Sequence, residues 1–255
     1  MPRLRALRLH RRVGWYPCAR NLAQLRNEPM TKPRAWIGAI ATTAALLTAC
    51  GDNIAGTPVA AAPASVTPTS LNTVLLGADQ ISGIMGASNM TAERPFTQLQ
   101  DNRLRLPNLN CLGILSVAET AIYEKSGLTA VRGQALREPD GGDWQHLAVQ
   151  AVITYPSADA AQKFFSESAD RWAKCQQHTS NITINAGPTT SWFFAKLDRT
   201  ATRLTMPVSV NNGQRKCQRD LSVFSNVVID VKACGPAITD QGANIADQIQ
   251  GRLPR

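Results

Sequence analysis

The sequence lacks the common catalytic signatures that spacing alone can reveal. It contains no G-x-S-x-G elbow, Walker loop, H-E-x-x-H motif or protein-kinase signature, the patterns that place a nucleophile, a phosphate cradle or a zinc-bound water. Histidine is scarce, with three residues in 255. Two of them, His146 and His178, stand in polar surroundings and are predicted to be solvated surface residues. The sequence therefore favours a protein that is not an enzyme.

Metal-binding spacings are absent as well. There is no C-x-x-C pair and no Cys/His cluster, which argues against a zinc site. Asp140 and Asp143 flank Gly141-Gly142 and form a local carboxylate pair, but a Gly-rich spacing of this kind is typical of a turn between strands. We therefore predict no catalytic residue, no metal ligand and no cofactor.

The apolar run near the N-terminus is too short to cross a membrane. It extends from Ala35 to Ala49, and its 15 residues reach only about 22 Å as a helix, against about 30 Å of hydrocarbon. Lys32 and Arg34 precede it, so the segment has the charged and apolar regions of a secretory signal. Residues 1–49 are predicted to be a signal peptide, and Met30 is favoured over Met1 as its start.

The end of this signal resembles the lipobox of bacterial lipoproteins. Leu47-Thr48-Ala49-Cys50 stands where an ordinary signal would end in A-x-A. The resemblance implies cleavage before Cys50 and attachment of fatty acyl chains, palmitate among them, to that residue. Two or three chains hold a protein firmly, so we expect a lipid anchor on the outer face of the cell membrane. An uncleaved membrane anchor is the alternative.

The positive charge belongs to the targeting segment. Of the 27 basic and 18 acidic residues, nine and one lie in residues 1–49, which leaves 18 and 17 in the rest of the chain. A strongly basic protein would suggest a nucleic-acid partner. The nearly neutral remainder gives no reason to expect one.

A low-complexity stretch follows the predicted lipidation site. Residues 50–70 are rich in Ala, Pro, Thr and Ser and offer too little apolar surface to offset chain entropy. We predict a tether there, followed by one globular domain over residues 71–255, a length that suits a single core.

Periodicity in this domain predicts helices among grouped strands. Helices are expected at Ala78 to Met85, from an N-cap at Ser157 to about Lys174, and from near Pro236 with a stripe of Ile238, Gly242, Ile245 and Ile249. Asp101 to Asn110 is expected to be loop. Strands are expected at Leu128 to Leu136, Gln145 to Tyr155, Ser191 to Leu197, Thr202 to Val210, Cys217 to Phe224 and Val227 to Cys234. This order favours an α+β domain with a twisted, mainly antiparallel sheet flanked by helices.

Four cysteines remain in the predicted domain, and they permit three pairings. A hairpin turning at Ser225-Asn226 would place Cys217 and Cys234 directly opposite each other, because they lie equally far from the turn. That register also opposes Arg219 and Lys232, an unfavourable pair. We favour the pairing of Cys217 with Cys234, which leaves Cys111 with Cys175.

Aromatic residues make up 5% of the chain, so the few in the domain are informative. Tyr155 and Trp172 fall on faces already assigned to the core. Trp144 and Trp192 are better candidates for an exposed or groove position. No ligand-binding residue can be named from the sequence.

The region from about Leu71 to Arg255 resembles the PknH-like extracellular domain, the sensor domain of certain actinobacterial serine/threonine kinases, which also occurs alone on secreted lipoproteins. The carriers of the resemblance are Leu75-Leu76, Ile81, Cys111, Ala121 to Tyr123, Ser126-Gly127, Val149 to Val152, Ala158 to Ala161, Trp172 to Cys175, Trp192, Cys217, Asn226 to Val228 and Cys234. The resemblance implies a twisted antiparallel sheet with helices, the two disulfides paired as above, and a cleft for an unidentified ligand.

These observations favour a lipid-anchored, extracytoplasmic, sensor-like or ligand-binding lipoprotein of the cell envelope. The chain differs from the kinase members in having no kinase signature, so signalling would need a protein partner. The expected ligand is an unidentified small molecule or envelope component. A secreted envelope hydrolase and a passive structural lipoprotein are the alternatives.

Overall fold

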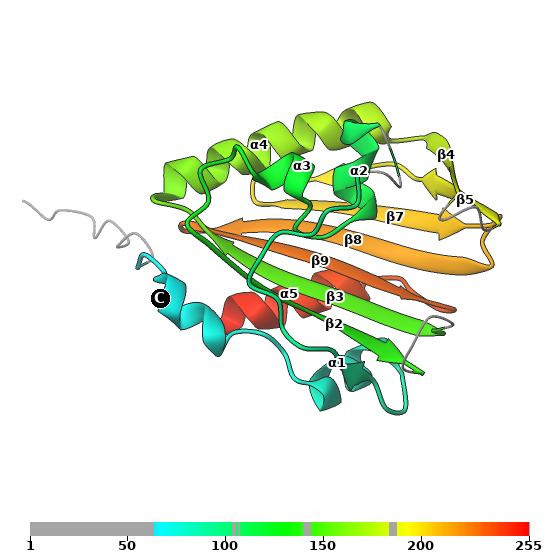
Figure 1. The fold of residues 1–255 in the computed structure, drawn as a ribbon, viewed down its shortest axis with the longest axis horizontal. Coiled ribbons are helices and arrows are strands. Elements are labelled where there is room, and N and C mark those ends of the chain that lie inside the picture. The colour runs from blue at the N-terminus through cyan, green and yellow to red at the C-terminus, as the bar shows by residue number, and fades with distance from the viewer. Residues whose placement is uncertain (1–63, 104–105, 107, 140–143, 184–187, 255) are drawn as a thin grey trace, which may run out of the picture. The chain divides into compact units, whose positions relative to one another are not determined.

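The computed structural model describes residues 64–103, 106, 108–139, 144–183 and 188–254 (Figure 1). The helical elements are η1 (Pro68–Asn72), α1 (Ala78–Met85), α2 (Leu109–Leu115), α3 (Thr120–Tyr123), α4 (Ala158–Cys175) and α5 (Gln241–Gly251). The strands are β1 (Thr91–Ala92), β2 (Ala130–Glu138), β3 (His146–Thr154), β4 (His178–Thr183), β5 (Thr189–Phe194), β6 (Asp198–Arg199), β7 (Arg203–Val210), β8 (Arg215–Phe224) and β9 (Val227–Gly235).

The nine strands form one sheet in the order β1-β2-β3-β9-β8-β7-β5-β4, with β6 paired to β7. Every pair of named strands is antiparallel. The predicted fold class, an α+β domain with a twisted antiparallel sheet, is confirmed.

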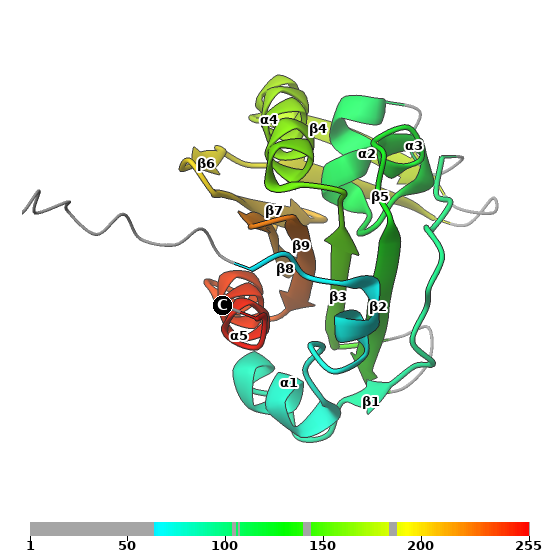
Figure 2. The same cartoon turned by 90° about the vertical axis from the view of Figure 1, so that its left-hand side faces the viewer.

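Helices cover both faces of the sheet (Figure 2). We call the side that carries α2, α3 and α4 the α4 face, and the side that carries η1, α1 and α5 the α5 face. Alternate residues of the central strands point to opposite faces of the sheet. Val228 of β9 packs in the core of the α4 face, and Ile229 packs in the core of the α5 face. Burial on both sides explains why β9 is apolar along most of its length.

The hairpin of β8 and β9 has the expected register. Phe224 pairs with Val227 across Ser225-Asn226, and Cys217 pairs with Cys234. Helix α4 begins as predicted, since the Ser157 hydroxyl accepts the N–H of Ala160 at 3.2 Å.

The last helix begins later than predicted. α5 begins at Gln241 rather than near Pro236, because the Gln241 side-chain oxygen accepts the N–H groups of Thr239 and Asp240 and closes a turn before the helix. Ile238 is buried, but it lies in the loop before α5. Gly242 lets the helix approach β8 closely, because a Cβ there would lie 3.0 Å from the Gln218 side-chain oxygen.

The folded region also begins before the predicted boundary between Ser70 and Leu71. Val66 and Leu71 are buried in the core of the α5 face, and the Val66 N–H donates to Asn226 Oδ1 at 2.7 Å. These two apolar side chains anchor residues 66–70, which the composition had assigned to the tether. Leu109 and Asn110, expected in a loop, instead open α2, and their turn is capped by Asn108 Oδ1.

Candidate functional site

Several residues singled out by the sequence lie outside the described residues. They are Cys50, with the signal and most of the tether around it, and the pair Asp140 and Asp143. Their predicted roles stay predictions.

Both disulfides have the favoured pairing. Cys217–Cys234 joins β8 to β9 with a Cα separation of 4.0 Å, and Cys111–Cys175 joins α2 to the end of α4 with a Cα separation of 5.2 Å. All four cysteines belong to the core of the α4 face. Their role in the folded domain is to crosslink that core.

The two histidines have different surroundings. His178 is exposed at the start of β4. His146 was expected to be solvated, but it is half-buried and its Nδ1 lies 2.9 Å from Glu138 Oε2 across the β2–β3 pair. The N–H groups of Asn89 and Ser88, together with His146, lower the pKa of Glu138. Glu138 therefore ties the start of β3 to the loop after α1, which is a structural role.

The aromatic residues separate as predicted into core and partly exposed positions. Tyr155 and Trp172 are buried. Trp144 and Trp192 are half-buried, and each ring faces a cation: Arg215 stands over Trp144, and Lys232 Nζ lies 4.8 Å from the Trp192 ring centre. Both rings pack against the core of the α4 face.

A buried arginine fixes the end of α2. The Arg219 side chain donates from Nε to the carbonyl of Ile114 at 2.7 Å and from Nη2 to that of Gly113 at 3.0 Å. Lys232 Nζ donates to the carbonyl of Leu115 at 2.8 Å. These carbonyls belong to the last turn of α2, where carbonyl groups have no N–H partner within their own helix. The two cations also interact favourably with the negative end of the helix dipole.

Asp230 balances this buried charge. Its Oδ1 accepts from Arg219 Nη2 at 2.6 Å. Its Oδ2 accepts the N–H of Ala118 and the hydroxyl of Tyr123, both at 2.9 Å. Burial and the neighbouring Asp230 raise the pKa of Tyr123. All these groups are satisfied by one another, so the cluster is built to hold α2 and α3 on the sheet rather than to receive a substrate.

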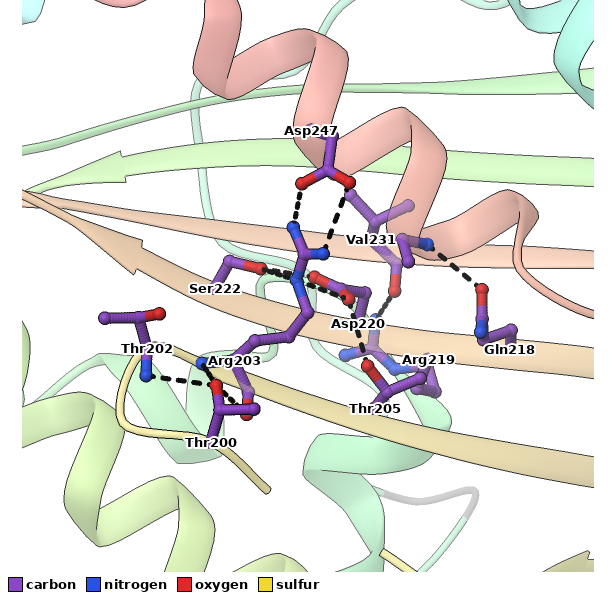
Figure 3. Close-up of polar contacts among 11 residues, drawn as sticks. Thr200, Thr202, Arg203, Thr205, Gln218, Arg219, Asp220, Ser222, Val231 and Asp247 are labelled. Carbon is purple, nitrogen blue, oxygen red and sulfur yellow. Dashed lines mark hydrogen bonds and ion pairs between the residues drawn. The ribbon is translucent and has the colours of Figure 1, made fainter. Parts of the chain in front are cut away.

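A second polar cluster connects the sheet to α5 (Figure 3). Arg203 on β7 forms a bidentate ion pair with Asp247 on α5, and its Nε lies 3.3 Å from Asp220 Oδ2. Asp220 also accepts hydrogen bonds from the hydroxyls of Thr205 and Ser222. Its side chain is inaccessible to solvent, and burial raises the pKa of Asp220 to about 6.

An apolar hollow lies on the α5 face beyond the reach of α5. The helix packs on β3, β8 and β9, whereas the Phe193 ring on β5 is 38% exposed. We call this hollow of about 250 Å³ the apolar groove; it is lined by Phe193, Ala195, Pro207, Val208, Ser209, Lys216, Cys217 and Ile238. Val208 and Cys217 contribute backbone, because their side chains belong to the core of the α4 face.

Two other hollows among the described residues are more polar. One of about 350 Å³ is lined by Gln145, Gln214, Arg215 and Pro236. The other, of about 210 Å³, is lined by Lys125, Ser126, Ala160, Lys163, Phe164 and Glu167. Ligand sites combine mainly apolar walls with few polar groups, so we take the apolar groove as the candidate site.

The sequence did not identify the residues whose side chains line the groove. Of these residues, it assigned only Ile238 a position, in the buried stripe of the last helix. The alternation in β5 places Phe193 opposite to the half-buried Trp192, but no pattern in the sequence tells which part of a sheet face a helix leaves uncovered.

The described part of the chain contains no group of three or more His, Cys, Asp or Glu residues suited to a metal ion. In the same residues, no helix combines the length and the apolar character that a membrane span requires.

Comparison with known proteins identifies relatives for most of the chain. A family model described as PknH-like extracellular domain matches residues 66–252. The chain is 34% identical over 185 residues to serine/threonine-protein kinase PknH of Mycobacterium bovis and to PknH of Mycobacterium tuberculosis. These matches cover 72% of this chain but only 30% and 29% of the two kinases.

A solved structure has the same fold. The crystal structure of the extracellular domain of PknH from Mycobacterium tuberculosis matches with a TM-score of 0.68 and 33% sequence identity. The match covers 74% of this chain and 97% of that domain.

Proposed function

The chain belongs to the family of PknH-like extracellular domains, and on that premise we propose that it is a non-catalytic, extracytoplasmic sensor module that binds a small molecule in the apolar groove. The family match covers the described domain almost from end to end. The kinase part of the relatives lies outside the match, so kinase activity is not part of the proposal.

The apolar groove is the observation that carries the proposal. Its lining contains no carboxylate and no histidine, the groups that most often act as general acid and base in hydrolases. Apolar walls with one cation and one hydroxyl are suited to binding instead.

We further propose that Cys50 is acylated and anchors the module to the outer face of the cell membrane. The support is the lipobox-like Leu47-Thr48-Ala49-Cys50 and the apolar run before it. The described chain enters the domain beside the β8–β9 turn, where Val66 bonds to Asn226. Lys216 stands near the other end of β8, eight residues or about 26 Å from Phe224 at the turn.

The groove residue Lys216 and the point where the described chain enters the domain therefore lie at opposite ends of β8. We propose that the bound state is passed to a separate signalling protein.

Native mass spectrometry of the protein purified from its own cell envelope tests ligand binding. We expect the wild type to carry an added small-molecule mass and Phe193→Ala to lose it, because the ring forms one wall of the groove. Leu109→Ala is the matched control, since Leu109 is also an exposed apolar residue, 49% accessible, but lies on α2. A wild type without added mass, or a Phe193→Ala protein that retains it fully, would contradict the proposal.

Intact-mass analysis tests the anchor separately. We expect the natural polypeptide to begin at Cys50 with acyl chains, and Cys50→Ser to leave the membrane fraction. Cys18→Ser should have no effect, whichever methionine starts translation. Membrane retention of Cys50→Ser with an unmodified mass would refute acylation and would leave the groove proposal standing.

A further inference from the structure

The lining of the apolar groove suits an apolar chain better than a compact polar molecule. Phe193, Ala195, Pro207 and Ile238 supply apolar side chains from two strands and from the loops after β5 and β9. The Phe193 ring and Pro207 remain accessible, so solvent still covers apolar surface that a ligand could displace.

The same groove contains one charge among its lining residues, the ammonium group of Lys216. Lys216 pairs across the sheet with Ser209 on β7 and with Gly235 on β9, so neither neighbouring strand places a carboxylate beside it. It is exposed and forms no ion pair with any residue that the structure describes. The hydroxyl of Ser209 lies in the same lining.

From this juxtaposition we propose that the apolar groove binds a single-chain amphiphile with an anionic head group, an inference that rests on the proposed function. The apolar chain would cover Phe193, Pro207 and Ile238. The head group would pair with Lys216 and accept a hydrogen bond from Ser209.

The position of the groove within the sheet disfavours an extended peptide as occupant. Peptides that add a strand need an unpaired sheet edge. β5 is paired with β4 and β7, and β7 is paired with β5 and β8, so the groove lies on a face with no free edge. An amphiphile needs only the face.

Calorimetric titration with three ten-carbon probes below their micelle concentrations tests the head-group charge. The probes are decyl phosphate, decyltrimethylammonium and decanol, and inorganic phosphate is the fourth ligand. We expect decyl phosphate to bind about tenfold more tightly than decyltrimethylammonium at low ionic strength, with decanol between them. Inorganic phosphate alone should bind far more weakly than decyl phosphate.

Variants locate the effect. Lys216→Gln should abolish the preference for the anion while binding decanol as the wild type does. Lys174→Gln, at an exposed lysine on α4, should keep the preference. Phe193→Ala should weaken all three decyl probes. Backbone amide shifts at Phe193 and Lys216 on titration would confirm the site.

The outcomes separate this inference from the proposed function. Equal binding of the three decyl probes, or an unchanged preference in Lys216→Gln, would overturn the anionic class while leaving the groove a binding site. Inorganic phosphate binding as tightly as decyl phosphate would overturn the role of the chain. Absence of binding by every decyl probe would overturn the inference that the ligand is an amphiphile. The proposed function would fail as well only if native mass spectrometry found no retained molecule.

Discussion

At the scale of single residues, Arg219 shows how a charge can be placed in the core. Its guanidinium group bonds to the carbonyls of Gly113, Ile114 and Val231 and to the carboxylate of Asp230. A buried charge is tolerated only when it is paired and hydrogen-bonded. The direct cross-strand neighbour Lys232 is also a cation, and both are stabilised because they share the carbonyl end of α2.

Replacing Arg219 by Met should lower the free energy of unfolding by about 3–5 kcal/mol, because it leaves Asp230 charged and buried without its partner. Urea unfolding followed by circular dichroism measures the change. Arg219→Lys keeps the charge but not the planar fork, so it should fall between Met and the wild type. Lys216→Met, on the same strand but exposed, should change stability by no more than about 0.5 kcal/mol. Equal effects of the two Met variants would show that the cluster does not stabilise the fold.

Asp220 gives the domain a specific pH dependence. Burial raises the pKa of Asp220 to about 6 from its ordinary value of 3.8, so the folded state holds the proton of this carboxyl group more tightly than the unfolded state does. The stabilising effect of that proton is fully present below about pH 4 and is lost as the pH rises through 6. Arg203 and Asp247 are the charged groups that face Asp220.

Asp220→Asn mimics the protonated acid and should remove this dependence. Relative to the wild type, the variant should gain about 2 kcal/mol in unfolding free energy between pH 4.5 and pH 7.5. Denaturant midpoints measured across that range for both proteins isolate the contribution of Asp220, because all other titrating groups are shared. A difference between the two proteins that stays constant with pH would contradict the assignment.

At the scale of elements, the strap formed by residues 64–72 is held by the side-chain amide of Asn226 in addition to its buried Val66 and Leu71. Asn226 Oδ1 accepts the N–H of Val66, and Asn226 Nδ2 donates to the carbonyls of Val66 and Tyr155 at 3.0 and 2.9 Å. One amide therefore satisfies three buried backbone groups and joins the entry of the domain to the β8–β9 turn and the end of β3.

Asn226→Ala should release the strap and cost about 2 kcal/mol, since it leaves three backbone groups without partners. Hydrogen exchange should show faster exchange of the amides from Val66 to Leu71, while the β8 and β9 amides remain protected. Ser225→Ala is the comparison variant, because it changes the same turn and removes the hydrogen bond from the Ser225 hydroxyl to the Ala64 carbonyl but leaves the Asn226 amide in place. Faster exchange in both variants alike would assign the effect to the turn rather than to the strap.

Elements with strong local signals were predictable from the sequence, and elements held by distant partners were not. β3 and α4 show period-two and helical spacing, and their bounds agree with the prediction to within one residue. α2 has seven residues and its last turn is completed by Arg219 and Lys232, more than 100 positions away. The strap likewise depends on Asn226. For the same reason the apolar groove, defined by where α5 ends its cover of the sheet, could not be located from local patterns.

At the scale of the whole molecule, the two disulfides constrain different distances along the chain. Cys111–Cys175 closes a loop of 64 residues and joins two helices, whereas Cys217–Cys234 closes 17 residues between strands that are already paired. Chain entropy alone assigns about 4 kcal/mol to the first and about 3 kcal/mol to the second. The larger loop also contains β2, β3 and α4.

Removing each bridge as a double Cys→Ala variant should therefore give unequal results. Cys111→Ala with Cys175→Ala should lower the unfolding free energy more than Cys217→Ala with Cys234→Ala does, because α2 and the end of α4 have no strand ladder to keep them together. The β8–β9 register should survive loss of its bridge, because the ladder of that hairpin extends from the Lys216–Gly235 pair to the Phe224–Val227 pair. Urea unfolding gives the two stabilities, and amide exchange reports the register. If the hairpin bridge proved the costlier one to remove, the loop-entropy account of this fold would be wrong and the sheet, rather than the helical layer, would depend on its crosslink.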